Sequence, residues 1–326
     1  MSPNTTGPYA DASAPDIQKT PFIDRFVTSP TSYSASANAG CRPSLERLDL
    51  NPIFIRQTGP LNWARRTFVR QLYKRVLKRE QVITLPSGRP MTLPLGSSFA
   101  SEIYITGCNV DWGAERLFYD MLTGKGAFLD IGANIGYFAL YMAPRATRTF
   151  AFEPDPRSIA RLESNLTGQG DIELVPMAVG REAGTAQFTL AGAPELSSLS
   201  AAGSSGSSGN ADTVSVPVVT IDGFVKERGL QVEAIKTDIE GFDLDALLAA
   251  TETLKGQRPL VLTEAPMNAE IAALAEGVDY AIWCYALNRE TGTKRFIEGK
   301  NLKSAESAKM LFMVPSERVG ELRSKA

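Results

Sequence analysis

Residues 128–138 read Phe-Leu-Asp-Ile-Gly-Ala-Asn-Ile-Gly-Tyr-Phe, an apolar run that ends in an acid and continues into two glycines. The run predicts a short buried strand over 127–131, and the apolar residues after the second glycine predict a helix over 137–143. Gly132 lets the backbone approach a ligand closely because it has no Cβ, and Gly136 lets the helix start tight against the strand. The free N–H groups at such a helix start can meet a carboxylate or a phosphate.

The same alternation of strand, turn and helix continues along the chain. It predicts further strands over 149–152, 172–179, 234–238 and 260–263, and helices over 156–166 and 244–254. Additional strands are expected over 186–190, 214–219, 280–287 and 310–314. This alternation is typical of a doubly wound α/β sheet that is mostly parallel and covered on both faces.

The composition predicts three segments. Residues 1–50 are rich in Pro, Ser, Thr, Ala and Asn, which indicates an irregular N-terminal arm. Residues 51–126 predict an N-terminal helix, a β-hairpin over 81–95 and a helical cap around 112–122. Residues 127–326 predict a catalytic domain, interrupted by a Gly/Ser-rich loop over 191–213 that is either a linker or a mobile loop over a cleft.

The N-terminal helix, expected over 61–80, is amphipathic and strongly basic. Its apolar residues recur at helical spacing, namely Val69, Leu72, Tyr73, Val76 and Leu77. Basic residues fill the other faces, namely Arg65, Arg66, Arg70, Lys74, Arg75, Lys78 and Arg79. We expect the apolar side to dock on the domain and the basic side to face solvent. A contact with nucleic acid or lipid is the less favoured alternative.

The 326 residues include no histidine, and 34 basic against 36 acidic residues give a net charge of −2. The absence of histidine excludes the commonest general base and every Ser-His or Cys-His nucleophile pair.

The balanced charge gives no global electrostatic field that would attract nucleic acid, so no nucleic-acid partner is expected. No segment approaches the roughly 20 apolar residues of a membrane span, and the first residues lack a signal-peptide pattern. Three widely spaced cysteines indicate no disulfide framework, so we expect a reduced, cytoplasmic protein.

The glycine spacing separates two nucleotide cofactors. A dinucleotide site has the pattern G-x-G-x-x-G after its strand, whereas this chain has G-x-x-x-G with an acid two residues before it. Such an acid can hold the ammonium group of S-adenosylmethionine, directly or through water, and would repel a pyrophosphate. We therefore expect S-adenosylmethionine as the cofactor, in a crevice formed by Asp130, Gly132, Asn134, Ile135 and Gly136.

Glu153 ends the next predicted strand, 23 residues after Asp130. A carboxylate at the end of the neighbouring strand can accept hydrogen bonds from both ribose hydroxyls. The alternative is that Glu153 caps the helix that follows it. Met177 and Ala178, near the end of the third strand, are candidates to flank the adenine, or else they are core residues.

Lys236, Asp238 and Glu240 lie at the end of the strand predicted over 234–238, beside the crevice of an open α/β sheet. Side chains two apart on a strand share a face, so both acids are expected to point into the crevice. They are candidate general bases, and Lys236 is a weaker candidate. Alternatively, Glu240 and Asp243 favour the N-terminus of the next helix through its dipole.

Several motifs in order resemble the FkbM family of methyltransferases. They are Asp-Ile-Gly-Ala-Asn-Ile-Gly-Tyr-Phe from 130, Ala-Phe-Glu-Pro-Asp-Pro from 151 with Asn165 downstream, Ser197–Leu199, Ile-Asp-Gly-Phe from 221, Lys-Thr-Asp-Ile-Glu-Gly-Phe-Asp from 236, and Glu264. The resemblance covers roughly residues 83–265. It implies a class I methyltransferase, Rossmann-like fold with an antiparallel last strand, and O-methylation of natural-product or carbohydrate hydroxyls with S-adenosylmethionine.

Methyl transfer from a sulfonium is an in-line displacement, so the protein mainly positions the acceptor and excludes water. The chain has no Asn-Pro-Pro-Tyr segment, which methyltransferases acting on the nitrogen of nucleobases or glutamine use to hold that planar nitrogen. It also has no cysteine in the crevice strands to form a thiol adduct with a pyrimidine, which argues against methylation of carbon. The expected acceptor is therefore the hydroxyl of a small molecule. We predict carboxylate chemistry with no metal; the alternative is a divalent cation on Asp238 and Glu264. A dinucleotide-dependent oxidoreductase and a non-catalytic scaffold with this fold remain alternatives, and a homo-oligomer remains open.

Overall fold

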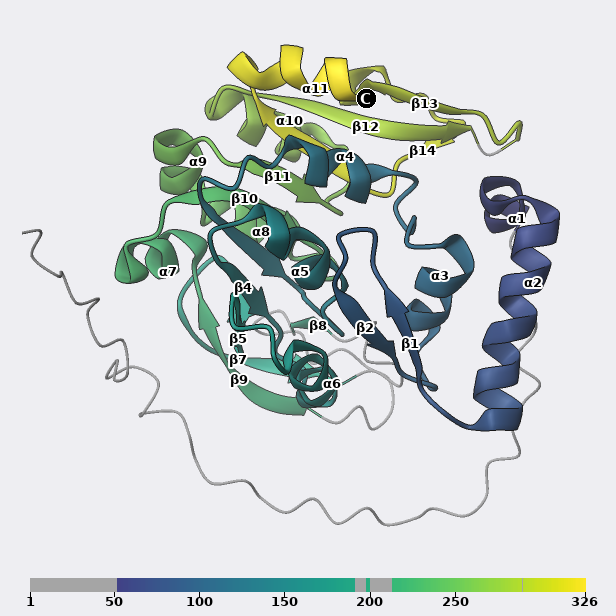
Figure 1. Cartoon of the computed structure of the whole chain (residues 1–326). Coiled ribbons are helices and arrows are strands. Elements are labelled where there is room, and N and C mark those ends of the chain that lie inside the picture. Colours follow the sequence, from purple (N-terminus) through teal and green to yellow (C-terminus); the bar gives the residue numbers. More distant parts are fainter. Residues whose placement is uncertain (1–51, 191–197, 200–212, 289) are drawn as a thin grey trace, which may run out of the picture. The chain divides into compact units, whose positions relative to one another are not determined.

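The computed structural model describes residues 52–190, 198–199, 213–288 and 290–326 (Figure 1). The arm expected over 1–50 and most of the loop expected over 191–213 lie outside the described residues. Residues 50–326 group into one compact unit. Within it, the hairpin residues Leu85, Met91 and Leu93 share a hydrophobic core with Tyr137 and Leu140 of the helix after the glycine turn.

A mixed sheet forms the centre of this unit. Its strands are β3 (Ala127–Ile131), β4 (Thr149–Phe152), β5 (Ile172–Val175), β10 (Val232–Thr237), β11 (Leu260–Thr263), β12 (Tyr280–Asn288), β13 (Lys294–Glu298) and β15 (Leu311–Pro315), with β14 (Glu306–Ser307) paired to β12. They are ordered β13-β12-β15-β11-β10-β3-β4-β5. The strands from β11 to β5 are parallel, and β15 is antiparallel to β11 and β12. The predicted doubly wound sheet with an antiparallel last strand is confirmed.

Helices cover both faces of this sheet (Figure 1). One face carries α4 (Ala114–Met121), α5 (Tyr137–Met142), α6 (Pro156–Leu166) and α11 (Val319–Lys325); the other carries α7 (Ile221–Arg228), α8 (Asp243–Leu248), α9 (Thr251–Gln257) and α10 (Ala269–Gly277). Short 3₁₀ turns are η3 (Ala143–Arg145), η5 (Gly299–Asn301) and η6 (Ser316–Arg318). Successive strand residues face opposite sides, so Phe128 packs in the first core and Leu129 in the second.

The helix expected over 244–254 is two helices, α8 and α9. The carboxylate of Asp222 accepts hydrogen bonds from the backbone N–H groups of Glu252 and Thr253 at 2.9 and 2.8 Å. These bonds satisfy N–H groups that a helix start leaves free, so they stabilise a second start at Thr251. Asp222, part of a family motif, therefore has a structural role here.

The strand expected over 172–179 is also two strands, and the prediction of one strand is wrong. Pro176 follows β5, and a proline has no N–H to continue a sheet ladder. After it, β6 (Ala178–Val179) joins a second sheet of order β6-β9-β7-β8. Its other strands are β7 (Gly184–Thr189), β8 (Ser198–Leu199) and β9 (Thr213–Val219).

The N-terminal segment contains the predicted long helix, hairpin and cap helix, and also two helices, α1 (Pro52–Thr58) and α3 (Ser98–Thr106), that were not predicted. The long helix is α2 (Pro60–Gln71) with a π-helical continuation η2 (Leu72–Leu77), and the hairpin strands are β1 (Gln81–Thr84) and β2 (Pro90–Leu93). Lys78 ends the long helix with a left-handed φ of 49°. The expected orientation of the helix is wrong in part, because Arg70 is fully buried while Val76 and Leu77 are exposed.

Arg70 is buried because the chain supplies oxygen atoms for its guanidinium. Its Nη2 donates to the carbonyl of Pro94 at 2.5 Å, and its Nε donates to the Ser101 hydroxyl at 3.3 Å. Hydrogen bonds of this kind repay the cost of burying a polar group. The helix α2 therefore packs against α3 through buried Arg70, while some of the apolar residues that were expected to face the domain remain exposed.

Candidate cofactor and acceptor site

A cavity of about 290 Å³ lies at the carboxyl ends of the central strands. The ends of β3, β4 and β10 form one side of it, and α3 with the segments before α4 and β15 forms the other. In open α/β sheets this edge is where ligands bind. The cavity brings together Gly132, Asn134, Glu153, Met177 and Ala178 of the predicted cofactor site with Lys236, Asp238 and Glu240 of the predicted catalytic site.

Gly132 is required by protein packing, which differs from the expected reason. A Cβ on Gly132 would lie 2.0 Å from the backbone oxygen of Asp238, and its φ is +77°. Because Gly132 has no side chain, the segment after β10 can approach its backbone closely. The glycine is therefore needed for this contact within the protein and not only for contact with a ligand. Gly136, with φ +90°, packs against α6, where a Cβ would lie 2.8 Å from Leu162.

Glu153 is held in place by two backbone donors. Its carboxylate accepts a hydrogen bond from Asn134 N at 2.8 Å and another from Asp155 N at 2.9 Å. Burial raises the pKa of Glu153 to about 7, and the two backbone hydrogen bonds oppose that rise. Each carboxylate oxygen has a second lone pair, so Glu153 can still accept hydrogen bonds from a ligand in the cavity. Met177 and Ala178, just beyond β5, line the same wall.

Asp130 lies deeper than expected. Its side chain is completely buried and lies 3.7 Å from Lys236 Nζ, and it does not line the cavity. Burial raises the pKa of Asp130 to about 6, against the effect of the lysine. Ile135 is likewise a core residue beneath the turn. Asn165, one of the family-motif residues, ties the turn to the hairpin by donating to the carbonyls of Ile135 at 2.8 Å and Thr92 at 3.2 Å.

Lys236 links three parts of the site. Its Nζ donates to the carbonyl of Gly132 at 3.0 Å and lies 3.4 Å from Asp238 Oδ2, in addition to its pairing with Asp130. Burial alone would lower the pKa of Lys236, but the charges of Asp238 and Asp130 outweigh burial and raise it. Lys236 is therefore a buried cation between two carboxyl groups.

Asp238 is the part of this network that faces the cavity, with 38% of its side chain exposed. Burial alone would raise the pKa of Asp238, but Lys236 and a hydrogen bond with Glu264 outweigh burial and lower it. The same hydrogen bond, together with burial, raises the pKa of Glu264. Of this pair, Asp238 therefore has the lower pKa and Glu264 the higher one.

Glu240 lies in the loop after β10, since the strand ends at Thr237. It has a left-handed φ of 44° and is exposed at the rim of the cavity. Burial, followed by the charges of Asp238 and Asp243, raises its pKa. Asp243 is buried at the start of α8 and accepts a hydrogen bond from Ile239 N at 3.4 Å.

The opposite wall contains residues that sequence reasoning missed. Lys309 donates to Glu102 at 2.9 Å and lies 3.6 Å from Asp111, and all three line the cavity with Ser98 and Phe99. Burial raises the pKa of Asp111 to about 6, although Lys309 opposes that rise. The sequence position of Lys309 could have indicated its place in the cavity. Lys309 lies just before the last strand, and because that strand is antiparallel, it starts at the edge of the sheet where the parallel strands end.

A signal also existed for α3. Ser97 accepts a hydrogen bond from Ala100 N at its start, and Gly107 ends it in the left-handed conformation. Serine before a helix and glycine after it are the usual boundary residues.

Within the described residues, no group of three or more His, Cys, Asp or Glu side chains is arranged to hold a metal ion.

Comparison with known proteins gives one family. A model of the "Methyltransferase FkbM domain" matches residues 130–283. A relative named 2-O-methyltransferase NoeI, from Sinorhizobium fredii strain NGR234, is 29% identical over 145 residues, which are 40% of this chain and 59% of the relative. The chain thus spans less than two thirds of the length of this relative.

Two solved structures are also similar. Methyltransferase FkbM from Methylobacillus flagellatus KT aligns with a TM-score of 0.39 and 16% identity, over 65% of this chain and 52% of that one. The tRNA (uracil-54, C5)-methyltransferase of Pyrococcus abyssi, in complex with S-adenosyl-L-homocysteine, aligns with a TM-score of 0.38 and 13% identity, over 72% and 44% of the two chains. The family match contains the glycine turn, Glu153 and the Lys236–Glu240 segment, and it confirms the predicted resemblance. Residues 130–283, just under half of the chain, are similar to the methyltransferase domain of the FkbM family.

Proposed function

We propose that this chain is an S-adenosylmethionine-dependent O-methyltransferase that acts on a hydroxyl of a small molecule, such as a natural product, sugar or glycan. One observation carries the proposal. The glycine turn and Glu153 share one cavity with Asp238, a carboxyl group whose pKa Lys236 lowers. The residues that would hold the cofactor and the residue that would accept the proton therefore face the same space. The name of the relative NoeI, a 2-O-methyltransferase, supports oxygen as the acceptor atom.

The cofactor would lie along the glycine turn. Glu153, oriented by the N–H groups of Asn134 and Asp155, would accept hydrogen bonds from the ribose hydroxyls. Met177 and Ala178 would flank the adenine. Asp130 lies below the cavity, so we propose that it supports the cofactor's cationic end through Lys236 and the turn rather than by direct contact. When bound, the cofactor supplies an activated methyl group.

The residues of this chain would handle the hydroxyl proton. Asp238 would accept it as the methyl group transfers, because a carboxylate is a weak base and the transfer is late. Lys236 is held as a cation, so we assign it to positioning Asp238 and not to proton abstraction. Glu240 remains the second candidate base. Glu102, Asp111 and Lys309 would orient the acceptor from the opposite wall.

Cofactor binding is tested by calorimetry on the Glu153→Ala variant. Hydrogen bonds to a charged group contribute roughly 1.5–3 kcal/mol, so we expect affinity for S-adenosylmethionine to fall about 10- to 100-fold. Glu163→Ala is the matched control, since Glu163 is exposed on α6 away from the cavity. Unchanged affinity in Glu153→Ala would remove Glu153 from the site. Tight binding of NADH by the unaltered protein would instead favour an oxidoreductase.

A further inference from the structure

The exposed large apolar side chains of the described residues all lie in one short stretch. They are Leu61, Phe68, Val76, Leu77 and Val82, and the exposed fractions of the first three are 86%, 70% and 69%. Single exposed apolar residues are ordinary, whereas a cluster marks an interaction site. The first four lie on α2 and η2, which together run from Pro60 to Leu77. We call the exposed side of these two elements, together with the exposed Lys78 and Arg79 that follow them, the outer face of α2–η2.

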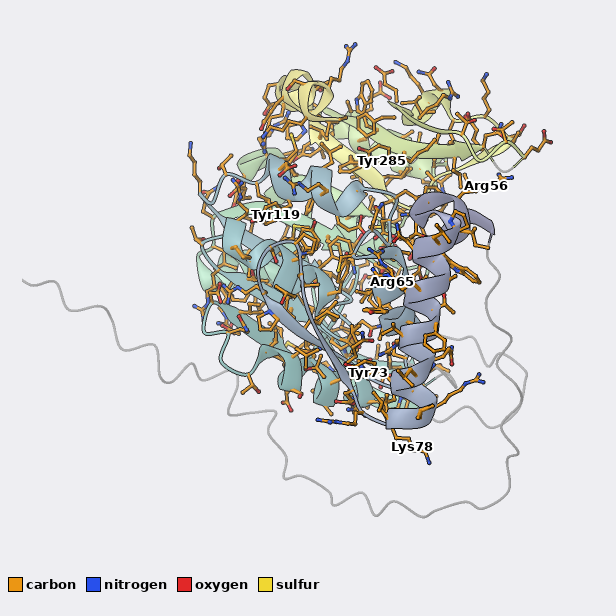
Figure 2. The ribbon with its side chains drawn as sticks, turned by 45° about the vertical axis from the view of Figure 1, so that its right-hand side comes forward. Arg56, Arg65, Tyr73, Lys78, Tyr119 and Tyr285 are labelled. Carbon is orange, nitrogen blue, oxygen red and sulfur yellow. The ribbon has the colours of Figure 1, made fainter. Side chains whose placement is uncertain are left out.

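Helical spacing places the most exposed of these apolar residues on the same side. Leu61, Phe68 and Val76 are separated by seven and eight residues, so they recur on one side of the helix. The opposite side is occupied by α3, because Arg66 Nη1 donates to the carbonyl of Ile105 at 3.2 Å and Arg70 is buried against the segment before α3. The outer face is therefore the side that the described part of the domain leaves uncovered (Figure 2).

The outer face is also strongly basic. Residues 61–79 contain seven Arg or Lys residues and no acid, in a chain whose net charge is −2. Two of the seven, Arg66 and Arg70, are directed to carbonyl oxygens of the domain. Arg65, Arg75, Lys78 and Arg79 are exposed. Figure 2 labels Arg65, Tyr73 and Lys78 along this helix.

We propose that the outer face of α2–η2 binds the surface of an anionic lipid bilayer. A helix that mixes exposed Leu, Phe and Val with Arg and Lys lies in the membrane interface, with its apolar side chains inserted and its basic side chains on the lipid phosphates. Long basic side chains can extend from such a helix to the headgroups. Nucleic acid would use the charges but leave the apolar side chains in water, so lipid satisfies more of this surface. No helix of the described residues is long and apolar enough to span the bilayer.

The outer face is one helix away from the cavity. Arg70 Nε on α2 donates to Ser101 on α3 at 3.3 Å, and Ser98, Phe99 and Glu102 of α3 line the cavity. Docking on a membrane would thus bring the proposed acceptor wall near the lipid surface. The proposal does not rest on methyltransferase activity, and its test measures binding alone.

The test is cosedimentation of the full chain with vesicles of phosphatidylcholine, with and without about one third phosphatidylglycerol. We expect binding to the anionic vesicles, little binding to phosphatidylcholine alone, and weakening at high salt. Each basic residue near the surface is worth about fivefold, so Arg75→Ser/Lys78→Ser should lower the partition coefficient about 30-fold. The matched control is Lys226→Ser/Lys255→Ser, two exposed lysines on α7 and α9, far from α2 in Figure 1.

The apolar contribution is tested separately with Leu61→Ser/Phe68→Ser, which alters no buried residue. This variant keeps every basic residue, so it should bind anionic vesicles more weakly than the unaltered chain, and the weakening should persist at low salt, where charge attraction is strongest. No binding of the unaltered chain to anionic vesicles would overturn the proposal. Normal vesicle binding by Leu61→Ser/Phe68→Ser would also overturn it. The same holds if the unaltered chain binds no vesicles and instead forms a dimer that these two substitutions dissociate. Binding of an oligonucleotide in preference to the vesicles would overturn it as well.

Discussion

Asp238 is a carboxyl group whose burial, taken alone, would raise its pKa. Lys236 Nζ, 3.4 Å away, and a hydrogen bond with Glu264 keep the pKa of Asp238 low all the same. A base must be ionised before it can accept a proton, and a low pKa makes it a weak one. This arrangement suits methyl transfer, in which the proton leaves only after the oxygen has begun to bond to carbon. The positioning of Asp238 then matters more than its basicity.

Asp238→Asn separates base catalysis from cofactor binding. The change keeps the size of the side chain and removes its charge. We expect turnover to fall by roughly 10²- to 10⁴-fold, the usual loss for a general base, while affinity for S-adenosylmethionine changes little. If Asp238 only supports the cofactor's cationic end, affinity should fall and turnover at saturation should survive. Glu240→Gln, measured in the same two ways, is the matched variant. Full turnover in both variants would contradict the carboxylate mechanism.

At the scale of elements, the turn between β3 and α5 fits against the segment after β10. Gly132→Ala would place a Cβ 2.0 Å from the oxygen of Asp238, at a φ of +77°. Overpacking and backbone strain of this kind each cost about 1–3 kcal/mol. We expect a lower melting temperature and, because Asp238 must move, lower turnover. Gly170→Ala is the control, since no atom lies within 4 Å of the added Cβ. Equal stability of the two variants would show that this contact is not tight.

The elements predicted correctly are those whose signals are local. The strand, turn and helix around Gly132 follow from neighbouring residues, and so does Glu153 at the end of the next strand. The parallel sheet follows because this alternation can bury two apolar strand faces in only a few ways. These local signals predicted which residues line the side of the cavity where we propose that the cofactor binds.

The elements predicted wrongly or missed depend on distant partners. The inward turn of Arg70 depends on the carbonyl of Pro94, and nothing in the helix itself indicates this partner. The wall that we propose for the acceptor depends on the contact of Lys309 with Glu102, which are 207 residues apart in the chain. The break at Pro176 was visible in the sequence, but the membership of β6 in a second sheet required its pairing with β9.

At the scale of the whole molecule, several buried carboxyl groups have raised pKa values. Burial raises the pKa of Glu115 to about 8, of Glu153 to about 7 and of Asp130 to about 6. In the unfolded chain these groups titrate near 4. The folded protein therefore binds more protons than the unfolded chain between about pH 4 and pH 8. Stability should be fully present at the acidic end of this window and fall as the pH rises through the folded pKa values.

Thermal melting between pH 5 and pH 8.5 checks this sign. We expect the melting temperature to fall toward pH 8.5, and for a domain of this size each kcal/mol lost corresponds to about 2–4 °C. Glu115→Gln should flatten the dependence, because a glutamine cannot ionise yet keeps an oxygen for Asp111 N, which Glu115 binds at 2.7 Å. Glu163→Gln, on an exposed residue of α6, should leave the slope unchanged. A melting temperature that rises with pH, or a Glu115→Gln profile identical to that of the unaltered protein, would mean that these buried carboxyl groups do not set the pH dependence of folding.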